Sequence, residues 1–305
     1  MPTPSGAMKI FAFRGINVYL HWTWAIIAYF QLKLRYDTYS HVGWAAAEYL
    51  TLFLIVLLHE FGHALACRQA GGRADTIMLW PLGGVAFVQP PPRPGAHLWS
   101  IVAGPLVNVI LIAPTVAAAW LYNGGVFGET RGNLGEFLFI IAVINIALLV
   151  FNLLPVYPLD GGQILRSILW FMIGPTNSLL IASMIGVAAS AVGLLISLRL
   201  AMIWLSVMAG FALWQSLAGF QRARAGMKWE NLPRHRHAAC PGCGSHPPAV
   251  PGWRCDACGQ QFDMVATAGA CPHCQAQYEA IPCPECGRHS PPMDWLRAAV
   301  MPTAR

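Results

Sequence analysis

Leu58-His59-Glu60-Phe61-Gly62-His63 is an H-E-x-x-H motif inside the long apolar run Gly43–Cys67. At 3.6 residues per helical turn, His59 and His63 lie one above the other, and both imidazoles can reach a single Zn²⁺. Glu60 is rotated from them by about 100° and lies close enough to take a proton from a water at the metal. Ionisable groups are costly in a bilayer and generally mark function there, which favours a metal site over a structural polar cluster.

The composition around this motif is that of a membrane protein. Hydrophobic residues make up 56% of the 305 residues and charged residues 10%, where soluble globular chains carry roughly 25% charged residues. So apolar a chain cannot cover a water-facing surface with polar groups, which excludes a soluble enzyme and a disordered protein. We therefore expect the chain to cross a membrane several times.

The apolar segments predict about six transmembrane helices, since each needs about 20 mostly apolar residues. The candidates are Tyr19–Leu32, Gly43–Cys67, Leu98–Tyr122, Leu134–Leu154, Ser178–Leu198 and Leu200–Phe220. One helix over the last two would be about 65 Å long, more than twice the hydrocarbon thickness, so a sharp hairpin is expected at Arg199. Thr76–Trp80 and Val85–Val88, joined through Pro81-Leu82-Gly83-Gly84, predict a β-hairpin between the second and third spans.

Lysine and arginine are distributed unevenly between the two sides of these spans. The side with both termini carries eleven of them and the opposite loops carry four. By the positive-inside rule, the termini, the mouth of the metal site and the tail are cytoplasmic, in a multi-pass protein of the inner cell membrane. Met1–Ile10 lacks the apolar core and cleavage site of a signal peptide, so the first span is expected to be an uncleaved anchor.

Asp160 is the candidate for the third protein ligand that a catalytic zinc requires. It lies in Leu154-Pro155-Val156-Tyr157-Pro158-Leu159-Asp160-Gly161-Gly162, near the cytoplasmic end of its span, as His59 does. Two prolines break the helix there, and non-helical backbone at membrane depth is tolerated where it lines a cavity. The alternative is that Asp160 is a helix N-cap at the membrane surface.

Three motifs in this order carry a family resemblance: His59–His63, Ala103–Asn108 (A-G-P-L-V-N) and Leu154–Gly162. Together with Gly15–Trp22 they resemble the site-2 protease family of intramembrane zinc metalloproteases. The resemblance implies His59, His63 and Asp160 as ligands of one catalytic Zn²⁺, Glu60 as general base, and a transmembrane segment of another protein as substrate. It also suggests that an edge of the expected hairpin holds unwound substrate as an added strand; the alternative is a plain connection.

Asn108, which ends the second motif, is a candidate catalytic residue beside Glu60. Its amide could steady a developing oxyanion or position the substrate. The alternative is a hydrogen-bonded link between helices, a common use of asparagine in membranes. The sequence favours the functional interpretation because the residue matches the asparagine of the family's motif.

Eight of the nine cysteines lie near the C-terminus in four C-x-x-C pairs: Cys240 and Cys243, Cys255 and Cys258, Cys271 and Cys274, Cys283 and Cys286. Eight thiols suit two structural Cys₄ zinc sites, with consecutive, crossed or nested pairing all possible. Disulfides are the alternative, but a cytoplasmic tail keeps thiols reduced. The predicted fold is an all-α polytopic membrane protein with a small C-terminal zinc-ribbon domain. Its expected parts are a transmembrane metalloprotease domain (1–227), a linker (228–239), a double zinc ribbon (240–290) and a flexible C-terminus (291–305).

The charge of the tail bears on its partners. From residue 228 on, seven basic residues face six acidic ones, and eight thiolates with two Zn²⁺ would bring the net charge to about −3. A nucleic-acid surface needs clustered positive charge, so a protein partner is expected and nucleic acid is not. The expected function is an intramembrane zinc endopeptidase that cleaves transmembrane segments in the lipid bilayer. The alternative is a non-proteolytic membrane scaffold or zinc-responsive regulator, which would not need Glu60.

Overall fold

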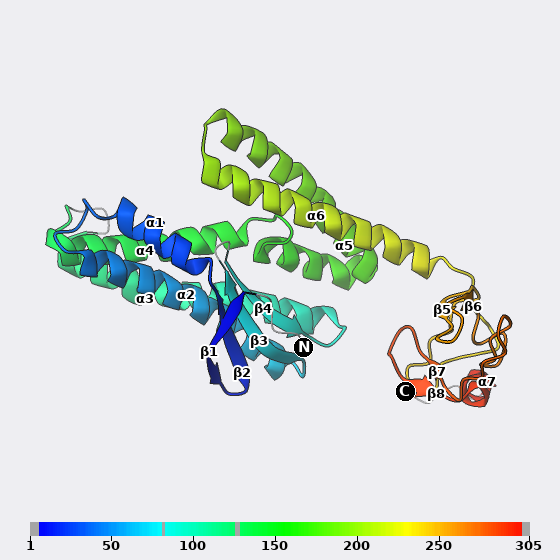
Figure 1. Cartoon of the computed structure of the whole chain (residues 1–305). Coiled ribbons are helices and arrows are strands. Elements are labelled where there is room, and N and C mark those ends of the chain that lie inside the picture. The colour runs from blue at the N-terminus through cyan, green and yellow to red at the C-terminus, as the bar shows by residue number, and fades with distance from the viewer. Residues whose placement is uncertain (1–5, 81–82, 126–128, 301–305) are drawn as a thin grey trace. The chain divides into compact units, whose positions relative to one another are not determined.

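A computed structural model of the chain describes residues 6–80, 83–125 and 129–300. The chain divides into two compact units, Met1–Ala223 and Arg224–Arg305. The order of elements can be followed in Figure 1: two strands, two helices, two strands and four helices, then four short strands and a last helix.

Six helices precede the cysteine-rich tail: α1 (Trp24–Leu34), α2 (Val42–Gln69), α3 (Pro94–Asn123), α4 (Gly132–Leu153), α5 (Asp160–Arg199) and α6 (Ile203–Glu230). Among the described residues, five of these, α2 to α6, are long and apolar enough to cross a membrane, whereas α1 has 11 residues. A helix of that length is about 16 Å long, about half the hydrocarbon thickness. The protein is therefore a multi-pass membrane protein with five candidate spans, and the expected six are not confirmed.

The expected first span, Tyr19–Leu32, is divided between a strand and α1. In β2 (Ile16–His21), the side chains of Ile16 and Val18 are fully buried, which is the two-residue period of a strand. β2 pairs in parallel with β3 (Arg73–Trp80), more than fifty positions away along the chain. A search for a continuous apolar run overlooks this division because strand and helix contribute to the same apolar stretch.

The four strands of the first unit form one sheet in the order β1-β2-β3-β4. β1 (Ala7–Phe13) pairs antiparallel with β2, and β3 pairs antiparallel with β4 (Gly83–Gln89). The expected hairpin after α2 is thus present as β3 and β4, while its connecting residues 81–82 lie outside the described residues. Because β2 pairs with β3, the N-terminal strands lie at the C-terminal end of α2 (Figure 1).

The sheet packs against the half of α2 that carries the H-E-x-x-H motif. Its buried face joins residues of α2 in one core that includes Ile16, Val18, Ile77, Leu79, Leu57, Ala64 and Cys67. Phe61 of α2 also packs edge-on against Phe13 of β1, with 5.8 Å between the ring centres. This packing fixes the sheet beside the motif.

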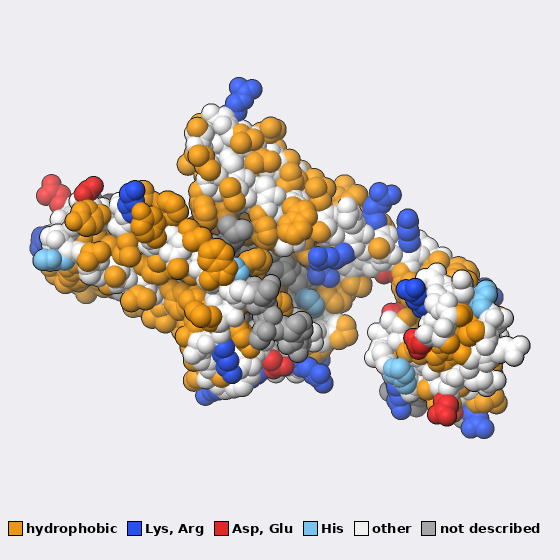
Figure 2. All heavy atoms as spheres, in the orientation of Figure 1, with side chains coloured by type: hydrophobic (Ala, Val, Ile, Leu, Met, Phe, Trp, Pro, Cys, Tyr) orange, Lys and Arg blue, Asp and Glu red, His pale blue; other side chains and the backbone are white. Residues whose placement is uncertain are grey.

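The proline-rich segment before α5 determines where that helix begins. α5 starts at Asp160 and bends at Gly174, whose φ of 80° is non-helical and which precedes Pro175. α5 ends at Arg199 and α6 begins at Ile203, so the sharp turn expected near Arg199 is present (Figure 1). Figure 2 shows hydrophobic side chains covering most of the visible surface of the long helices, as a lipid-facing surface requires.

The second unit is built from short hairpins around an apolar core. β5 (Trp253–Arg254) pairs with β6 (Gln261–Phe262), and β7 (Ile281–Pro282) pairs with β8 (His289–Ser290). The core contains Trp253, Phe262, Ile281 and Trp295, together with the first cysteine of each C-x-x-C pair. Within the end that was expected to be flexible (291–305), Pro292–Val300 form helix α7, whose Trp295 is fully buried in this core, while residues 301–305 lie outside the described residues.

Candidate metal centre and active site

His59 and His63 of α2 meet Asp160, the first residue of α5, at a buried point of the first unit. His59 Nε2 lies 3.0 Å from His63 Nε2 and 3.1 Å from Asp160 Oδ2. His63 Nε2 lies 3.4 Å from Asp160 Oδ1. The three residues are only 6%, 6% and 8% exposed. The fold thus brings together the three residues that the sequence proposed as ligands.

Hydrogen bonds to α3 determine where the two imidazoles carry their protons. His63 Nδ1 lies 2.9 Å from the main-chain oxygen of Ser100, which can only accept, so Nδ1 is the protonated nitrogen. His59 Nδ1 donates in the same way to Asn108 Oδ1 at 2.6 Å. In a neutral imidazole the other nitrogen is then an acceptor. In their neutral form, both imidazoles therefore face Asp160 with the lone pair of Nε2.

Asn108 is itself oriented by Asn145 of α4. Asn145 Nδ2 donates to the main-chain oxygen of Asn108 at 3.2 Å, which leaves Asn145 Oδ1 to accept from Asn108 Nδ2 at 2.8 Å. The side-chain oxygen of Asn108 consequently faces His59. These contacts orient His59 through Asn108, and they also link α3 to α4.

The chemistry of the three ligand atoms fits a cation. They lie within 4.8 Å of one another, and all are acceptors. Asp160 Oδ2 is buried without a hydrogen-bond partner, and with a neutral His59 the nearby Nε2 offers it no proton. Buried acceptors that face each other are unfavourable unless a positive charge lies between them. Two imidazole nitrogens and one carboxylate suit Zn²⁺ and leave a fourth position open for catalysis.

Glu60 lies beside this group and is held by strand β4. The Ala86 N–H donates to Glu60 Oε2 at 2.8 Å. Gly84 permits this close approach, because a Cβ at that position would lie 2.2 Å from Glu60 Cγ. The role of Ala86 could not be read from the sequence, because it acts through its main-chain N–H.

The close packing of α3 on α2 explains the Ala103–Asn108 motif. A Cβ at Gly104 would lie 2.2 Å from His63 Nε2, so a larger residue would push α3 away from the centre. At this separation Ser100 and Asn108 reach both Nδ1 atoms. The role of Ser100 could not be read from the sequence, because a main-chain oxygen is common to every residue.

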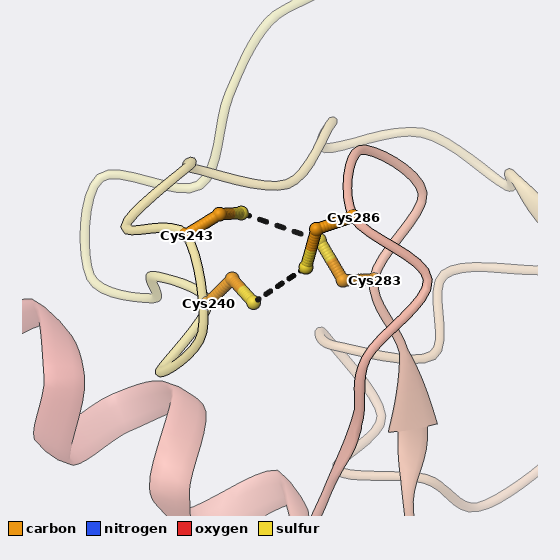
Figure 3. A group of neighbouring side chains, drawn as sticks. All are labelled: Cys240, Cys243, Cys283 and Cys286. Carbon is orange, nitrogen blue, oxygen red and sulfur yellow. Dashed lines mark hydrogen bonds between the residues drawn. The ribbon is translucent and has the colours of Figure 1, made fainter. Parts of the chain in front are cut away.

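The tail cysteines form two groups with nested pairing (Figure 3), which the sequence left open. Cys240 faces Cys286 and Cys243 faces Cys283, with Sγ–Sγ distances of 3.7 and 3.8 Å. Cys255 faces Cys274 and Cys258 faces Cys271, at 3.6 and 3.8 Å. Disulfide sulfurs lie about 2.05 Å apart, and all nine cysteines of the described chain are free thiols. We call these sets the outer and the inner cysteine group.

Tyr278 adds a polar partner to the inner cysteine group. Its hydroxyl donates to Cys255 Sγ at 3.3 Å and accepts the Asp256 N–H at 2.7 Å. The hydrogen bond from Tyr278 lowers the pKa of the Cys255 thiol to about 6. The contact thus favours the thiolate, the form of cysteine that binds metals.

An H-E-x-x-H helix whose histidines meet a distant aspartate among membrane-length helices defines a membrane metallopeptidase type of protein. The profile of peptidase family M50 matches residues 47–131 and 125–196. The zinc metalloprotease MJ0392 of Methanocaldococcus jannaschii is 32% identical over 192 residues, 63% of this chain and 54% of that protein. Stage IV sporulation protein FB of Bacillus subtilis is 37% identical over 119 residues, 38% of each chain.

A comparison with solved structures also points to this family. The site-2 protease from Methanocaldococcus jannaschii matches with a TM-score of 0.52 and 28% identity, over 70% of this chain and 95% of that one. The chain therefore belongs to peptidase family M50, the site-2 protease family. It spans about half the length of the curated relatives it matches.

Proposed function

We propose that the protein is an intramembrane zinc metalloendopeptidase that cleaves transmembrane or membrane-adjacent segments of other proteins. The observation that supports this most strongly is the acceptor-only group of His59, His63 and Asp160 beside Glu60. With neutral imidazoles these acceptors favour a bound cation, and Glu60 adds the residue that a metal-holding scaffold would not need.

The protein side of the centre holds and orients the metal. When bound, zinc supplies a Lewis acid that polarises the scissile carbonyl and lowers the pKa of a water. His59 and His63 would hold it through Nε2, and Asp160 would hold it through its carboxylate. Ser100 and Asn108 keep the imidazoles in the required tautomer and orientation.

Glu60 serves first as general base and then as general acid. Its Oε2 accepts the Ala86 N–H, so the proton of the attacking water is taken up at Oε1. The carboxyl then delivers that proton to the leaving amine of the cleaved peptide bond. The hydrogen bond from β4 keeps the side chain in one position, and such positioning is a large part of the catalytic effect.

Strand β4 is the proposed binding site for the unwound substrate. A helical substrate hides its peptide bonds in its own hydrogen bonds and must be locally extended before attack. β4 is the terminal strand in the order of the described sheet, and it passes beside Glu60. An extended segment paired along this strand would present its peptide bonds close to the general base.

The orientation in the membrane follows from the distribution of lysine and arginine. We place the protein in the inner cell membrane, with the N-terminal strands, the mouth of the centre and the tail in the cytoplasm. The short α1 does not change this assignment, because β2 pairs with β3 and keeps the N-terminal strands at the C-terminal end of α2.

Substitution of the general base tests the proposal. The full chain is purified in detergent and incubated with a broad set of helical membrane segments. Glu60→Gln should retain zinc and lower the rate of cleavage by about 10²–10⁴-fold, the usual contribution of a general base. Glu48→Gln is the matched control, since Glu48 is another buried glutamate of α2, and it should cleave at the wild-type rate per folded molecule. The proposal fails if the wild type cuts no segment or if Glu60→Gln cuts equally fast.

A further inference from the structure

The four C-x-x-C pairs of the tail share one backbone turn. The residue after each second cysteine donates its N–H to the main-chain oxygen of the first cysteine, at 2.8–2.9 Å; these residues are Gly244, Gly259, Gln275 and Gly287. All four have φ between 62° and 74°. Each first cysteine in turn donates its N–H to the oxygen five residues later, at 2.8–2.9 Å. Four copies of one turn that face each other in pairs indicate two tetrathiolate metal sites.

Because the pairing is nested, the two cysteine groups close chain loops of different length. The inner cysteine group closes a short loop, since Cys255 and Cys274 are 19 positions apart. The outer cysteine group joins Cys240 and Cys286, which are 46 positions apart and enclose the inner group. A short loop costs less entropy to close, so the inner site can form without the outer one.

The last pair of the outer group also contacts the end of α6, whose residues 224–230 belong to the second unit. Glu285, between Cys283 and Cys286, accepts hydrogen bonds from Trp229 Nε1 at 3.1 Å and from Arg234 at 3.2 Å. Trp229 lies in the last turn of α6. The outer group and the end of this helix are thereby joined through one carboxylate.

Arg234 ties the first pair of the outer group to the same place. Its guanidinium donates to the main-chain oxygen of His246, just beyond Cys243, at 3.0 Å and to that of Trp229 at 3.2 Å. It also lies over the Trp229 ring, 5.8 Å from the ring centre. A tetrathiolate Zn²⁺ site carries a net charge of about −2, and the cation of Arg234 lies close to the two pairs that would form it.

We infer that the outer cysteine group binds a structural Zn²⁺ that fastens both ends of the tail to the last turn of α6 through Glu285 and Arg234. The inner group binds a second Zn²⁺ independently of it. Zinc at the outer site therefore controls how often the segment after α6 opens locally. This inference does not rest on the proposed peptidase activity.

The test compares zinc content and native-state proteolysis of the full chain in detergent. Zinc per chain is measured by plasma mass spectrometry, and opening of the segment after α6 is measured as the rate of trypsin cleavage at the exposed Arg236. The double variant Cys243→Ser/Cys286→Ser removes one exposed ligand from each outer pair. It should hold one zinc fewer than the wild type and be cleaved at least about tenfold faster, since cleavage tracks local opening. Unchanged zinc content, a loss of two zincs, or an unchanged cleavage rate would overturn the inference.

A second variant separates the contact with α6 from the folding of the metal site. Glu285→Gln should keep the wild-type zinc content and be cleaved at Arg236 about three- to tenfold faster, because it loses charge-assisted hydrogen bonds. Asp256→Asn, an acidic residue within an inner pair, is the matched control and should change neither quantity. Glu285→Gln with the wild-type cleavage rate would disprove the link between the outer site and α6.

Discussion

Two buried carboxylates of the first unit, Glu48 and Asp160, differ in the groups that face them. Glu48 is 2% exposed and accepts from Gln31 Nε2 at 2.9 Å, Arg35 Nε at 3.1 Å and Tyr39 O–H at 2.7 Å. Burial and the hydrogen bond to Glu48 raise the pKa of Tyr39, which keeps its hydroxyl a donor. Asp160, in contrast, faces the Nε2 atoms of two imidazoles, which are acceptors when the rings are neutral.

The comparison shows that the balance of donors and acceptors, and not burial alone, separates a structural polar group from a functional one. The Glu48 group is complete within the protein: its charge is paired with Arg35, which also reaches Glu136 of α4 at 3.2 Å. It ties the end of α1 to α2 and α4. With neutral imidazoles, the Asp160 group lacks a positive charge among its three acceptors, which a bound metal ion would supply.

The largest effect is expected from Asp160→Asn, which converts an acceptor into a donor. The new amide can donate to the imidazole lone pairs, so the group becomes satisfied without metal. The variant should fold, bind one zinc fewer than the wild type, and cleave at least about 10³-fold more slowly, since a metal Lewis acid contributes several kcal/mol. Zinc content and cleavage rate measure this, and a variant that keeps both at the wild-type level would contradict the comparison.

The next effect is expected from Gly84→Ala, which disturbs Glu60 and leaves the ligands in place. The added Cβ must displace either β4 or the Glu60 side chain. A misplacement of about 1 Å can lower catalysis by about 10²-fold, so cleavage should fall by that order while zinc content stays at the wild-type level. Gly43→Ala is the control, since no atom lies within 4 Å of a Cβ there. Equal cleavage rates for the two variants would remove β4 from the mechanism.

A smaller effect is expected from Asn108→Leu, which removes the partner of His59 Nδ1. Loss of a hydrogen bond that orients a metal ligand typically weakens metal binding by about 10–100-fold. Competition with a chelator measures this affinity at the centre. Asn145→Leu, one hydrogen bond further from the metal, should weaken it less, and the opposite order would favour a purely interhelical role for the pair.

The smallest effect on catalysis is expected from Glu48→Gln, which alters the group that is complete without metal. The neutral amide leaves Arg35 with weaker pairing, and the free energy of unfolding should fall by about 1–3 kcal/mol. Thermal unfolding in detergent measures this loss, while zinc content and cleavage per folded molecule should not change. A loss of zinc in this variant would show that the two groups are not independent.

The sequence could predict which residues lie together because the spacing of a helical motif and a proline break are local signals. His59, His63 and Asp160 lie together as expected, and the hairpin after α2 and the turn at Arg199 are present. The sequence also singled out Asn108, but it did not reveal the contact of its side-chain oxygen with His59.

The features that the sequence did not predict depend on contacts distant along the chain or on main-chain atoms. β2 pairs with β3 across the whole of α1 and α2, so no local pattern reveals it. Ser100 and Ala86 act through main-chain groups that every residue has. The nested pairing of the cysteines depends on how the tail folds back, because the four C-x-x-C pairs are chemically equivalent.

The zinc content of matched variants tests directly whether His59, His63 and Asp160 form a metal centre. Full-length wild type, His63→Ala and Glu48→Gln are purified side by side in detergent, and zinc per chain is measured by plasma mass spectrometry. His63→Ala should hold one zinc fewer than the wild type, while Glu48→Gln should hold the same number. A His63→Ala protein with the wild-type zinc content would contradict a metal centre at these three residues.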